Sequence, residues 1–350
     1  MTWVASMAGA CTGRDRGANM RAAVVDTGTF SVCEVDDPTP GPDDLILEVS
    51  ACGICGSDIK TAPFLPAGTI MGHEFAGTVV AAGRDVAAQW QIGTPATAMP
   101  VSGCGTCLSC VCGDVARCTL VEAFGLGGRA GGFAEYIRVS ARETVRFDGA
   151  PPAVGAVTEP LAVGLHAVAR GAIKPGHRVL IVGAGPVGIA ILLWAVRQGV
   201  DEIVVSDPVA SRRTSALVYG ASSVVDPTAD HPGEGFDVVF ECVGLRGMIA
   251  ACLESVAPRG RIVVAGVCLE EDGFMPVAGV VKDIDMSFVS YYTRQEFTLA
   301  AKLLQQSRID VSDFITGRGG LDDLGRLIAE LGSPSNQQKV LIEPQQVLVG

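Results

Sequence analysis

The chain has 350 residues, of which 48% are hydrophobic and 5% aromatic, and it contains 44 glycines. This length accommodates two cores, and the composition is that of a folded α/β protein, which excludes a disordered chain. The formal charge of −12 argues against nucleic acid or an anionic membrane as a partner, because both attract basic surfaces. No uninterrupted apolar run approaches the ~20 residues of a membrane-spanning helix.

The N-terminal segment from Met1 to Asn19 lacks the long apolar core of a secretion signal. We expect residues 1–19 to form a loose extension and the first strand to start near Met20. The chain contains 12 cysteines, and without a secretion signal such cysteines indicate metal binding and not a disulfide framework. A cytoplasmic location is therefore expected.

The stretch from Met20 to about Val145 predicts a small β-barrel. Short runs of β-forming residues are separated by Gly, Pro and Asp at close intervals, which is typical of a compact all-β domain. The expected strands cover residues 21–25, 29–34, 45–49, 76–82 and 134–139. Two cysteine-bearing loops interrupt these strands.

The first loop carries Cys55 in the run Cys-Gly-Ile-Cys-Gly-Ser-Asp, and His73-Glu74 follow between a glycine and the next strand. A thiolate, an imidazole and a carboxylate are the ligand types of a catalytic zinc, which needs about three protein donors and one open position. The alternative is a buried cysteine and a surface His-Glu pair.

The second loop contains five cysteines between positions 104 and 118. Four thiolates at short-loop spacing suit a closed, tetrahedral structural zinc. An iron–sulfur cluster is the alternative, but the fourth cysteine follows after seven residues and no proline succeeds it, which favours zinc. Cys112 has no assigned partner. The expected structural ligands are Cys104, Cys107, Cys110 and Cys118.

A glycine turn at residues 183–188 predicts a dinucleotide site. An apolar strand over 178–182 leads into it, and an apolar helix runs from it to about residue 198. Gly183 permits the tight turn, Gly185 lets backbone approach a pyrophosphate, and Gly188 lets the helix pack close to the strand. The expected cofactor contacts here are Gly183, Gly185, Pro186, Val187 and Gly188.

Asp207 ends the next expected strand, residues 202–206, and lies 19 positions after Gly188. An acid at this distance accepts hydrogen bonds from the adenosine ribose and repels a 2′-phosphate, which favours NAD over NADP. Arg212 and Arg213 follow closely. Arg212 is included among the expected cofactor contacts, and its charge keeps NADP open as an alternative.

Beyond Asp207, alternating strands and helices predict a doubly wound parallel sheet. Expected strands cover 223–225, 236–240, 261–265 and 286–289, and expected helices cover about 209–219 and 247–257. Amphipathic helices at 295–307 and 321–331 and a strand at 339–342 follow. Strand ends on the cofactor side contribute Val243, Gly266 and Val267 as candidate contacts, for which ordinary strand-end packing is the alternative.

In these motifs the chain resembles the zinc-containing medium-chain alcohol dehydrogenases of the sorbitol, threonine and polyol dehydrogenase type. The resemblance extends from about Met20 to the C-terminus, and its motifs occur in the family's order. The matching runs are Cys55-Gly56-Ser57-Asp58, Gly72-His73-Glu74, the four-cysteine loop, Thr158-Glu159-Pro160-Leu161-Ala162-Val163 and Gly183–Gly188.

The resemblance implies a GroES-like β-barrel catalytic domain over residues 20–156, completed by 293–350, and a Rossmann domain over 157–292. It also implies two zinc ions per chain, one catalytic and one structural, and a homodimer or homotetramer. The reaction would be hydride transfer between an alcohol, as a secondary alcohol or polyol, and NAD, with the ketone as the reverse substrate.

By the same resemblance, Cys55 and His73 hold the catalytic zinc together with Glu74 or Glu159, depending on state. Ser57 takes the substrate proton, and Asp58 orients a ligand. Glu159 also begins an expected helix, where an acid is favourable for the dipole alone. His166, inside that helix, is expected to be packed or cleft-facing and not a ligand.

Two rival functions remain from the sequence. One is an NADPH-dependent carbonyl or enone reductase of the same fold, against which Asp207 and the complete ligand set both argue. The other is a zinc-stabilised dinucleotide-binding protein without turnover, which a degraded ligand set would favour. Here Cys55, His73 and Glu74 are all present.

Overall fold

The computed structural model describes residues 19–333 and 335–346. The predicted extension falls largely outside these residues, but Asn19 already belongs to the first strand, which therefore starts one residue earlier than expected. Within the described chain, contacts define two compact units. The first holds the residues up to Glu159, Ala301–Ser333 and those from Lys339 onward, and the second holds Pro160–Ala300 and the described residues of Pro334–Gln338.

The first unit is built on a seven-stranded sheet in the order β16-β17-β3-β4-β5-β9, with β8 also pairing with β3. Its strands are β3 (Asp44–Gly53), β4 (Glu74–Ala82), β5 (Pro95–Ala98), β8 (Tyr136–Ser140), β9 (Thr144–Arg146), β16 (Ile315–Gly319) and β17 (Lys339–Ile342). Two smaller antiparallel pairs accompany it, β1 (Asn19–Asp26) with β2 (Thr29–Asp36) and β6 (Val101–Ser102) with β7 (Glu122–Ala123). Its helices include α1 (Gly56–Thr61), α2 (Leu108–Cys112), α3 (Pro152–Gly155) and α10 (Leu324–Leu331).

The central strand β3 joins this sheet together. It pairs with β4, β8 and β17, and its alternate residues Leu45, Leu47 and Val49 are fully buried in the main apolar core. Because β17 pairs antiparallel with β3, the C-terminal segment enters the same sheet as the N-terminal one.

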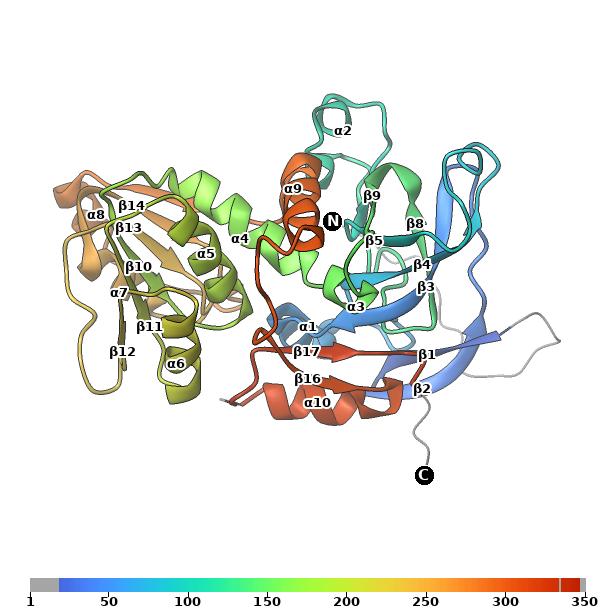
Figure 1. Cartoon of the computed structure of the whole chain (residues 1–350). Coiled ribbons are helices and arrows are strands. Elements are labelled where there is room, and N and C mark those ends of the chain that lie inside the picture. The colour runs from blue at the N-terminus through green and yellow to red at the C-terminus, as the bar shows by residue number, and fades with distance from the viewer. Residues whose placement is uncertain (1–18, 334, 347–350) are drawn as a thin grey trace. The chain divides into compact units, whose positions relative to one another are not determined.

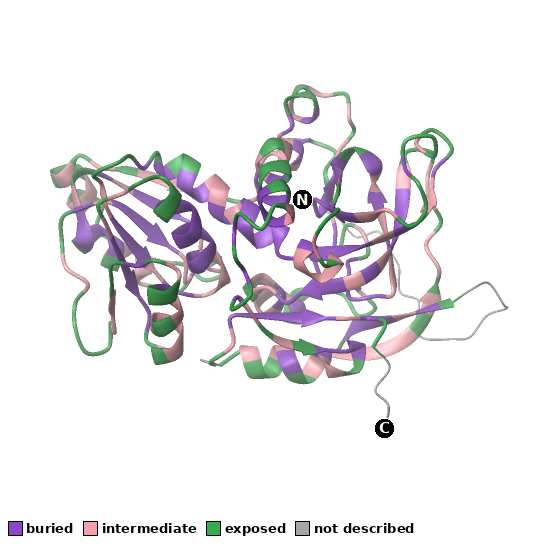
Figure 2. Ribbon diagram, viewed as in Figure 1, coloured by how far each residue is buried: buried purple, intermediate pink, exposed green. Residues whose placement is uncertain are grey.

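The second unit is a six-stranded sheet in the order β12-β11-β10-β13-β14-β15, and every neighbouring pair is parallel. This is the Rossmann order, in which the strand order reverses between β10 and β13, so the predicted doubly wound sheet is confirmed. Helices cover its faces (Figure 1) and its inner strands are buried (Figure 2). The strands are β10 (Arg178–Val182), β11 (Glu202–Ser206), β12 (Ser223–Val225), β13 (Phe236–Glu241), β14 (Val256–Val264) and β15 (Asp285–Phe288).

The helices that follow these strands are α5 (Pro186–Arg197), α6 (Ala210–Val218), α7 (Met248–Ser255) and α8 (Pro276–Lys282), and α4 (Thr158–Gly171) and α9 (Arg294–Gln305) lie before and after them in the chain. By length and composition alone, the helical stretch Pro152–Gly171 could cross a membrane. However, 61% of its tested window is buried inside the protein, so packing accounts for its apolar character.

Candidate active site

Three side chains with metal-binding atoms converge in the first unit. The ligand atoms of Cys55, His73 and Glu74 all lie within 4.8 Å of one another. Cys55 is the N-cap of α1, Glu74 is the first residue of β4, and His73 immediately precedes it. The neighbouring Cys52 is fully buried, and burial raises the pKa of its thiol well above the ordinary value, so it remains an apolar core residue.

Asp58 and Ser57 orient the imidazole of His73. Asp58 is fully buried, and its Oδ2 accepts a hydrogen bond from the Cys55 backbone N–H at 2.9 Å. Its Oδ1 lies 3.2 Å from His73 Nδ1, which makes this an ion-pair contact, and neither atom has a hydrogen-bond partner. Ser57 Oγ lies 3.3 Å from the other ring nitrogen, Nε2. The hydroxyl expected to move a proton and the carboxylate of Asp58 thus lie at different nitrogens of the ring.

The electrostatics of the cluster favour a cation. Burial by itself lowers the pKa of His73, but the carboxylate of Asp58 and the sulfur of Cys55 outweigh it and raise this pKa well above 6.5. A sulfur, an imidazole backed by a carboxylate and a nearby acid form a donor set of the zinc type, so the residues present fit a zinc ion.

Lys339, which the sequence reasoning missed, pairs with Glu74. Its side chain is fully buried, and Nζ lies 2.6 Å from both carboxylate oxygens of Glu74 and 3.1 Å from the carbonyl oxygen of Ile54. Burial lowers the pKa of Lys339, but Glu74, Cys55 and Glu159 together raise it above its ordinary value. The only sequence signal was a lysine at the start of an otherwise apolar strand.

Glu159 stands in the first turn of α4 and is buried. It does not belong to the group formed by Cys55, His73 and Glu74, although it contributes to the charge around Lys339. Of the two acids expected at the catalytic zinc, the structure brings Glu74 to the sulfur and the imidazole.

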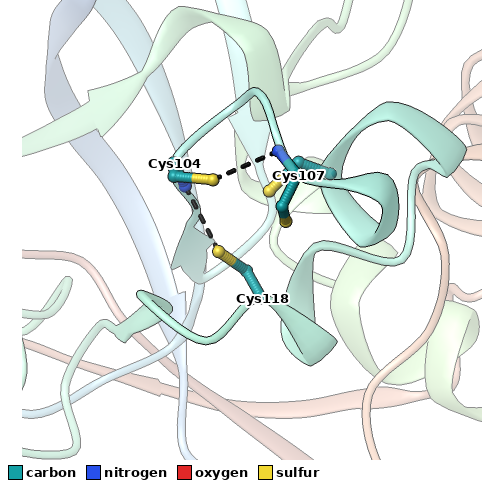
Figure 3. A group of neighbouring side chains, drawn as sticks. Cys104, Cys107 and Cys118 are labelled. Atoms are coloured by element: carbon teal, nitrogen blue, oxygen red, sulfur yellow. Dashed lines mark hydrogen bonds between the residues drawn. The ribbon is translucent and has the colours of Figure 1, made fainter.

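The four cysteines of the second loop also converge. The sulfurs of Cys104, Cys107, Cys110 and Cys118 lie within 4.8 Å of one another. Figure 3 shows the Cys104 sulfur facing the Cys107 backbone N–H and the Cys118 sulfur facing the Cys104 N–H, each at 3.4 Å. Backbone N–H groups stabilise thiolates, and those of Thr106 and Cys107 lower the pKa of Cys104 to about 6. The set fits a closed tetrahedral zinc, and Cys112 is exposed beside it.

The glycine turn follows the expected geometry. Gly183 has φ +98°, a conformation that favours glycine, and Gly185 is the N-cap of α5, with Pro186 in its first turn. A Cβ built at Gly188 would overlap the carbonyl oxygen of Gly183, whereas one built at Gly185 would meet nothing within 4 Å. Gly188 therefore serves packing, and the space beside Gly185 is open.

Asp207 has a structural role that the sequence did not reveal. It is 4% exposed, and its carboxylate accepts hydrogen bonds from the backbone N–H groups of Ala184 and Val209, both at 2.8 Å. Asp207 thus connects the glycine turn to the end of β11 through hydrogen bonds. Each oxygen retains acceptor capacity for a ribose hydroxyl. Arg213 donates to the Asp207 carbonyl oxygen and pairs with Asp226 at 3.0 Å, while Nε of Arg212 is buried without a hydrogen-bond partner.

The strand-end candidates lie against the turn. A Cβ at Gly183 would meet Val243, and one at Gly266 would overlap Gly244, so the loops after β10, β13 and β14 are closely packed. The buried Glu241 accepts hydrogen bonds from the N–H groups of Val243 and Gly244 at 2.7 and 2.8 Å. These backbone groups thus have a packing role, while Val267 is 45% exposed.

His166 is engaged within the second unit. Its Nδ1 lies 3.1 and 3.2 Å from the two carboxylate oxygens of Glu296, which also accepts a hydrogen bond from the Thr293 N–H. It is a packed residue that links α4 to α9.

Two clusters of metal-binding side chains and a Rossmann sheet are the features of a zinc-binding dehydrogenase. Residues 41–149 match the alcohol dehydrogenase GroES-like domain, and residues 186–306 match the zinc-binding dehydrogenase domain. The chain belongs to the zinc-containing medium-chain alcohol dehydrogenase family, as its motifs predicted, and it is an oxidoreductase acting on alcohols.

Relatives span most of its length. Scyllo-inosose 3-dehydrogenase of Thermotoga maritima is 32% identical over 71% of this chain and 72% of its own. L-threonine 3-dehydrogenase of Saccharopolyspora erythraea is 31% identical over 83% and 88%. A solved structure from Sinorhizobium meliloti 1021, described as a zinc-binding dehydrogenase bound to NADP, is 32% identical with a TM-score of 0.85 over 94% of this chain and 100% of its own.

Proposed function

We propose that the protein catalyses the NAD-linked oxidation of a secondary alcohol or polyol and the reverse reduction of the ketone. The observation that carries this proposal is the convergence of Cys55, His73 and Glu74 within 4.8 Å, with Ser57 Oγ at 3.3 Å from the imidazole. The names of the inosose and threonine relatives refer to secondary carbons, which supports this substrate class.

Each side chain of this group has its own role in the proposed reaction. Cys55 and His73 would hold a zinc ion with one carboxylate, and Asp58 would keep the imidazole ring in its orientation. When bound, zinc supplies Lewis acidity that favours the deprotonated alcohol. Ser57 would take the proton of the substrate hydroxyl while passing its own hydroxyl proton outward. A bound nicotinamide would supply the acceptor for the hydride of the substrate carbon. A second zinc ion at the four cysteines would stabilise their loop and would take no part in the reaction.

NAD is the proposed cofactor because Asp207 places a carboxylate at the end of β11, where a 2′-phosphate would be repelled. Arg213, which pairs with Asp226, is engaged elsewhere. The runner-up is an NADPH-linked carbonyl reductase. It is favoured by Arg212 and by the relative that was solved with NADP.

The test is a screen of NAD⁺ and NADP⁺ reduction over polyols, short diols, aromatic alcohols and amino alcohols. Cys55→Ala should abolish activity and remove one of two zinc ions, while the control Cys33→Ala, in the β1–β2 hairpin, retains both. A Cys55→Ala enzyme with full activity would refute the zinc mechanism. A wild-type enzyme that prefers NADP⁺ would refute the cofactor assignment.

We further propose that the protein acts in the cytoplasm as a homo-oligomer, with no nucleic-acid or membrane partner. An exposed apolar face on the second unit supports self-association. Helix α8 has no buried residue, and β15 is the open edge of the parallel sheet. The exposed apolar side chains there are Met275, Val277, Val280, Val281 and Phe288. A second copy of the chain would cover this face and the free strand edge.

A further inference from the structure

The pair formed by Lys339 and Glu74 is a buried ion pair inside the proposed metal site. Lysine is almost never fully buried unless it is paired, and here both side chains are within 1% of complete burial. The three hydrogens of the ammonium group have three acceptors, namely the two Glu74 oxygens at 2.6 Å and the Ile54 carbonyl oxygen at 3.1 Å. The ammonium group is therefore fully satisfied and held in one place.

The register of the sheet creates this contact. Gly53 is the partner of Glu74 across β3 and β4, and it is also the partner of Leu341 across β3 and β17. Lys339 precedes Leu341 by two positions and therefore shares its face of β17. A Cβ built at Gly53 would overlap Glu74 Oε2, so glycine leaves the space in which the carboxylate crosses toward Lys339.

The charges explain what the pair does. Cys55 as thiolate and the carboxylates of Asp58, Glu74 and Glu159 carry four negative charges, of which a zinc ion would balance two. Lys339 supplies the third positive charge in a region where an uncompensated charge is costly. Because both Glu74 oxygens face Nζ, the ammonium group competes with the metal for this carboxylate.

We propose that Lys339 is a positioning residue that keeps Glu74 out of the zinc coordination sphere and thereby preserves the open position for the alcohol. This inference rests on the proposed zinc-dependent function. It predicts that Glu159, and not Glu74, is the carboxylate that binds the metal alongside Cys55 and His73. Without Lys339, Glu74 would turn to the metal as a further ligand and close the site.

The first test compares Lys339→Met with wild type in enzyme whose catalytic zinc is replaced by cobalt. Lys339→Met should bind catalytic zinc more tightly, by about ten- to a hundredfold in chelator competition, which is the range over which outer-shell groups tune metal affinity. Its cobalt visible spectrum should change, and kcat should fall. The double variant Lys339→Met/Glu74→Gln removes both charges and should restore the wild-type spectrum. Equal or weaker zinc binding by Lys339→Met would overturn the inference.

A second pair of variants keeps Lys339 and covers the case in which Lys339→Met does not fold. Glu74→Gln should leave the cobalt spectrum and the zinc affinity within about threefold of wild type, well below the effect of losing a ligand. Glu159→Gln should change both. The reverse pattern would overturn the inference while leaving the proposed function intact. Zinc found only at the four-cysteine site of the wild type would overturn both.

Discussion

Gly188 and Gly185 illustrate how two residues of one motif serve different purposes. A side chain at Gly188 would overlap the Gly183 carbonyl oxygen, while the space at Gly185 is open and its φ of −71° suits any residue. The motif spacing predicts both glycines, but only the structure separates the packing role from the open position.

Gly188→Ala should therefore lower the free energy of unfolding by about 3 kcal/mol, since overpacking forces backbone shifts. Gly185→Ala should leave stability within about 0.5 kcal/mol and weaken NAD⁺ binding about tenfold, or about 1.4 kcal/mol. Urea unfolding and fluorescence titration of the cofactor check these outcomes. Equal stability losses in the two variants would contradict this division of roles.

Asp207 also acts in two ways. Because its carboxylate accepts hydrogen bonds from the N–H groups of Ala184 and Val209, the expected contact with the ribose is not its only function. Asp207→Ser should raise the KM for NAD⁺ by about tenfold or more, through loss of hydrogen bonds to a charged group, and should also lower Tm. Steady-state kinetics with both cofactors, with Tm measured in parallel, separate the two effects. An unchanged ratio of NAD⁺ to NADP⁺ activity would contradict the selectivity role.

At the level of elements, the link between α4 and α9 depends on the charge of Glu296. Burial raises its pKa, but hydrogen bonds from His166 and the Thr293 N–H outweigh this and lower it below 4.5. A lowered carboxyl pKa stabilises the fold above the unfolded-state value and is lost as the pH falls through the folded-state value.

Glu296→Gln should lower stability by about 1–2 kcal/mol at pH 7, with the difference from wild type shrinking as the pH drops below about 4.5. Urea unfolding between pH 3.5 and 7 tests this. Glu254→Gln is the control, because Glu254 faces His231 at 3.9 Å but is 71% exposed. A difference for Glu296→Gln that does not depend on pH would contradict the role of the charge.

The cysteine loop allows a test that distinguishes a proposed metal ligand from a neighbouring cysteine. Cys110 is buried among the other sulfurs, whereas Cys112, two residues further along α2, is exposed. Cys110→Ser should release one zinc ion per chain and expose residues 104–118 to proteolysis, and Cys112→Ser should do neither. Metal analysis and limited proteolysis check both. Retention of both metals in Cys110→Ser would contradict the assignment.

Some helices and strands could be predicted from sequence patterns, and others could not. Strands β10, β11, β12 and β17 fall on their expected bounds because each is a short run of β-branched and other apolar residues that begins at a polar residue. The expected start of β14 at residue 261 was wrong, because Val256 already pairs with Phe236 across a register shift. The residues Pro258-Arg259-Gly260 have the composition of a turn, and the sequence pattern therefore placed the start of the strand after them. Helix α8 was missed because it has no buried side to give it periodicity.

For the whole molecule, the doubly wound sheet and the family followed from the sequence, because five motifs occur in order along one chain. The role of Lys339 as a counter-charge could not be predicted from the sequence, because no local pattern connects it to its partners. Ile54 lies 285 positions away from Lys339 and Glu74 lies 265 positions away. Long-range pairing in a mixed sheet supplies that information.

The exposed face around α8 bears on assembly. Val280→Asp should convert an oligomer into a monomer, because a charge at this face opposes burial against a second copy. Sedimentation velocity measures the outcome. Val218→Asp on α6 is the control, since Val218 is 66% and Val280 75% exposed. A wild-type monomer, or identical sedimentation of the two variants, would contradict the proposed contact.

The late position of β17 in the chain means that the two proposed metal sites become complete at different times during synthesis. The four cysteines lie within positions 104–118, so that loop can load its ion as soon as it emerges. Lys339 is translated hundreds of residues after Ile54, with the whole Rossmann unit in between. The nascent N-terminal unit therefore lacks the ammonium group beside Glu74 until β17 has been synthesised, so the reactive centre is completed only after the Rossmann unit has been translated.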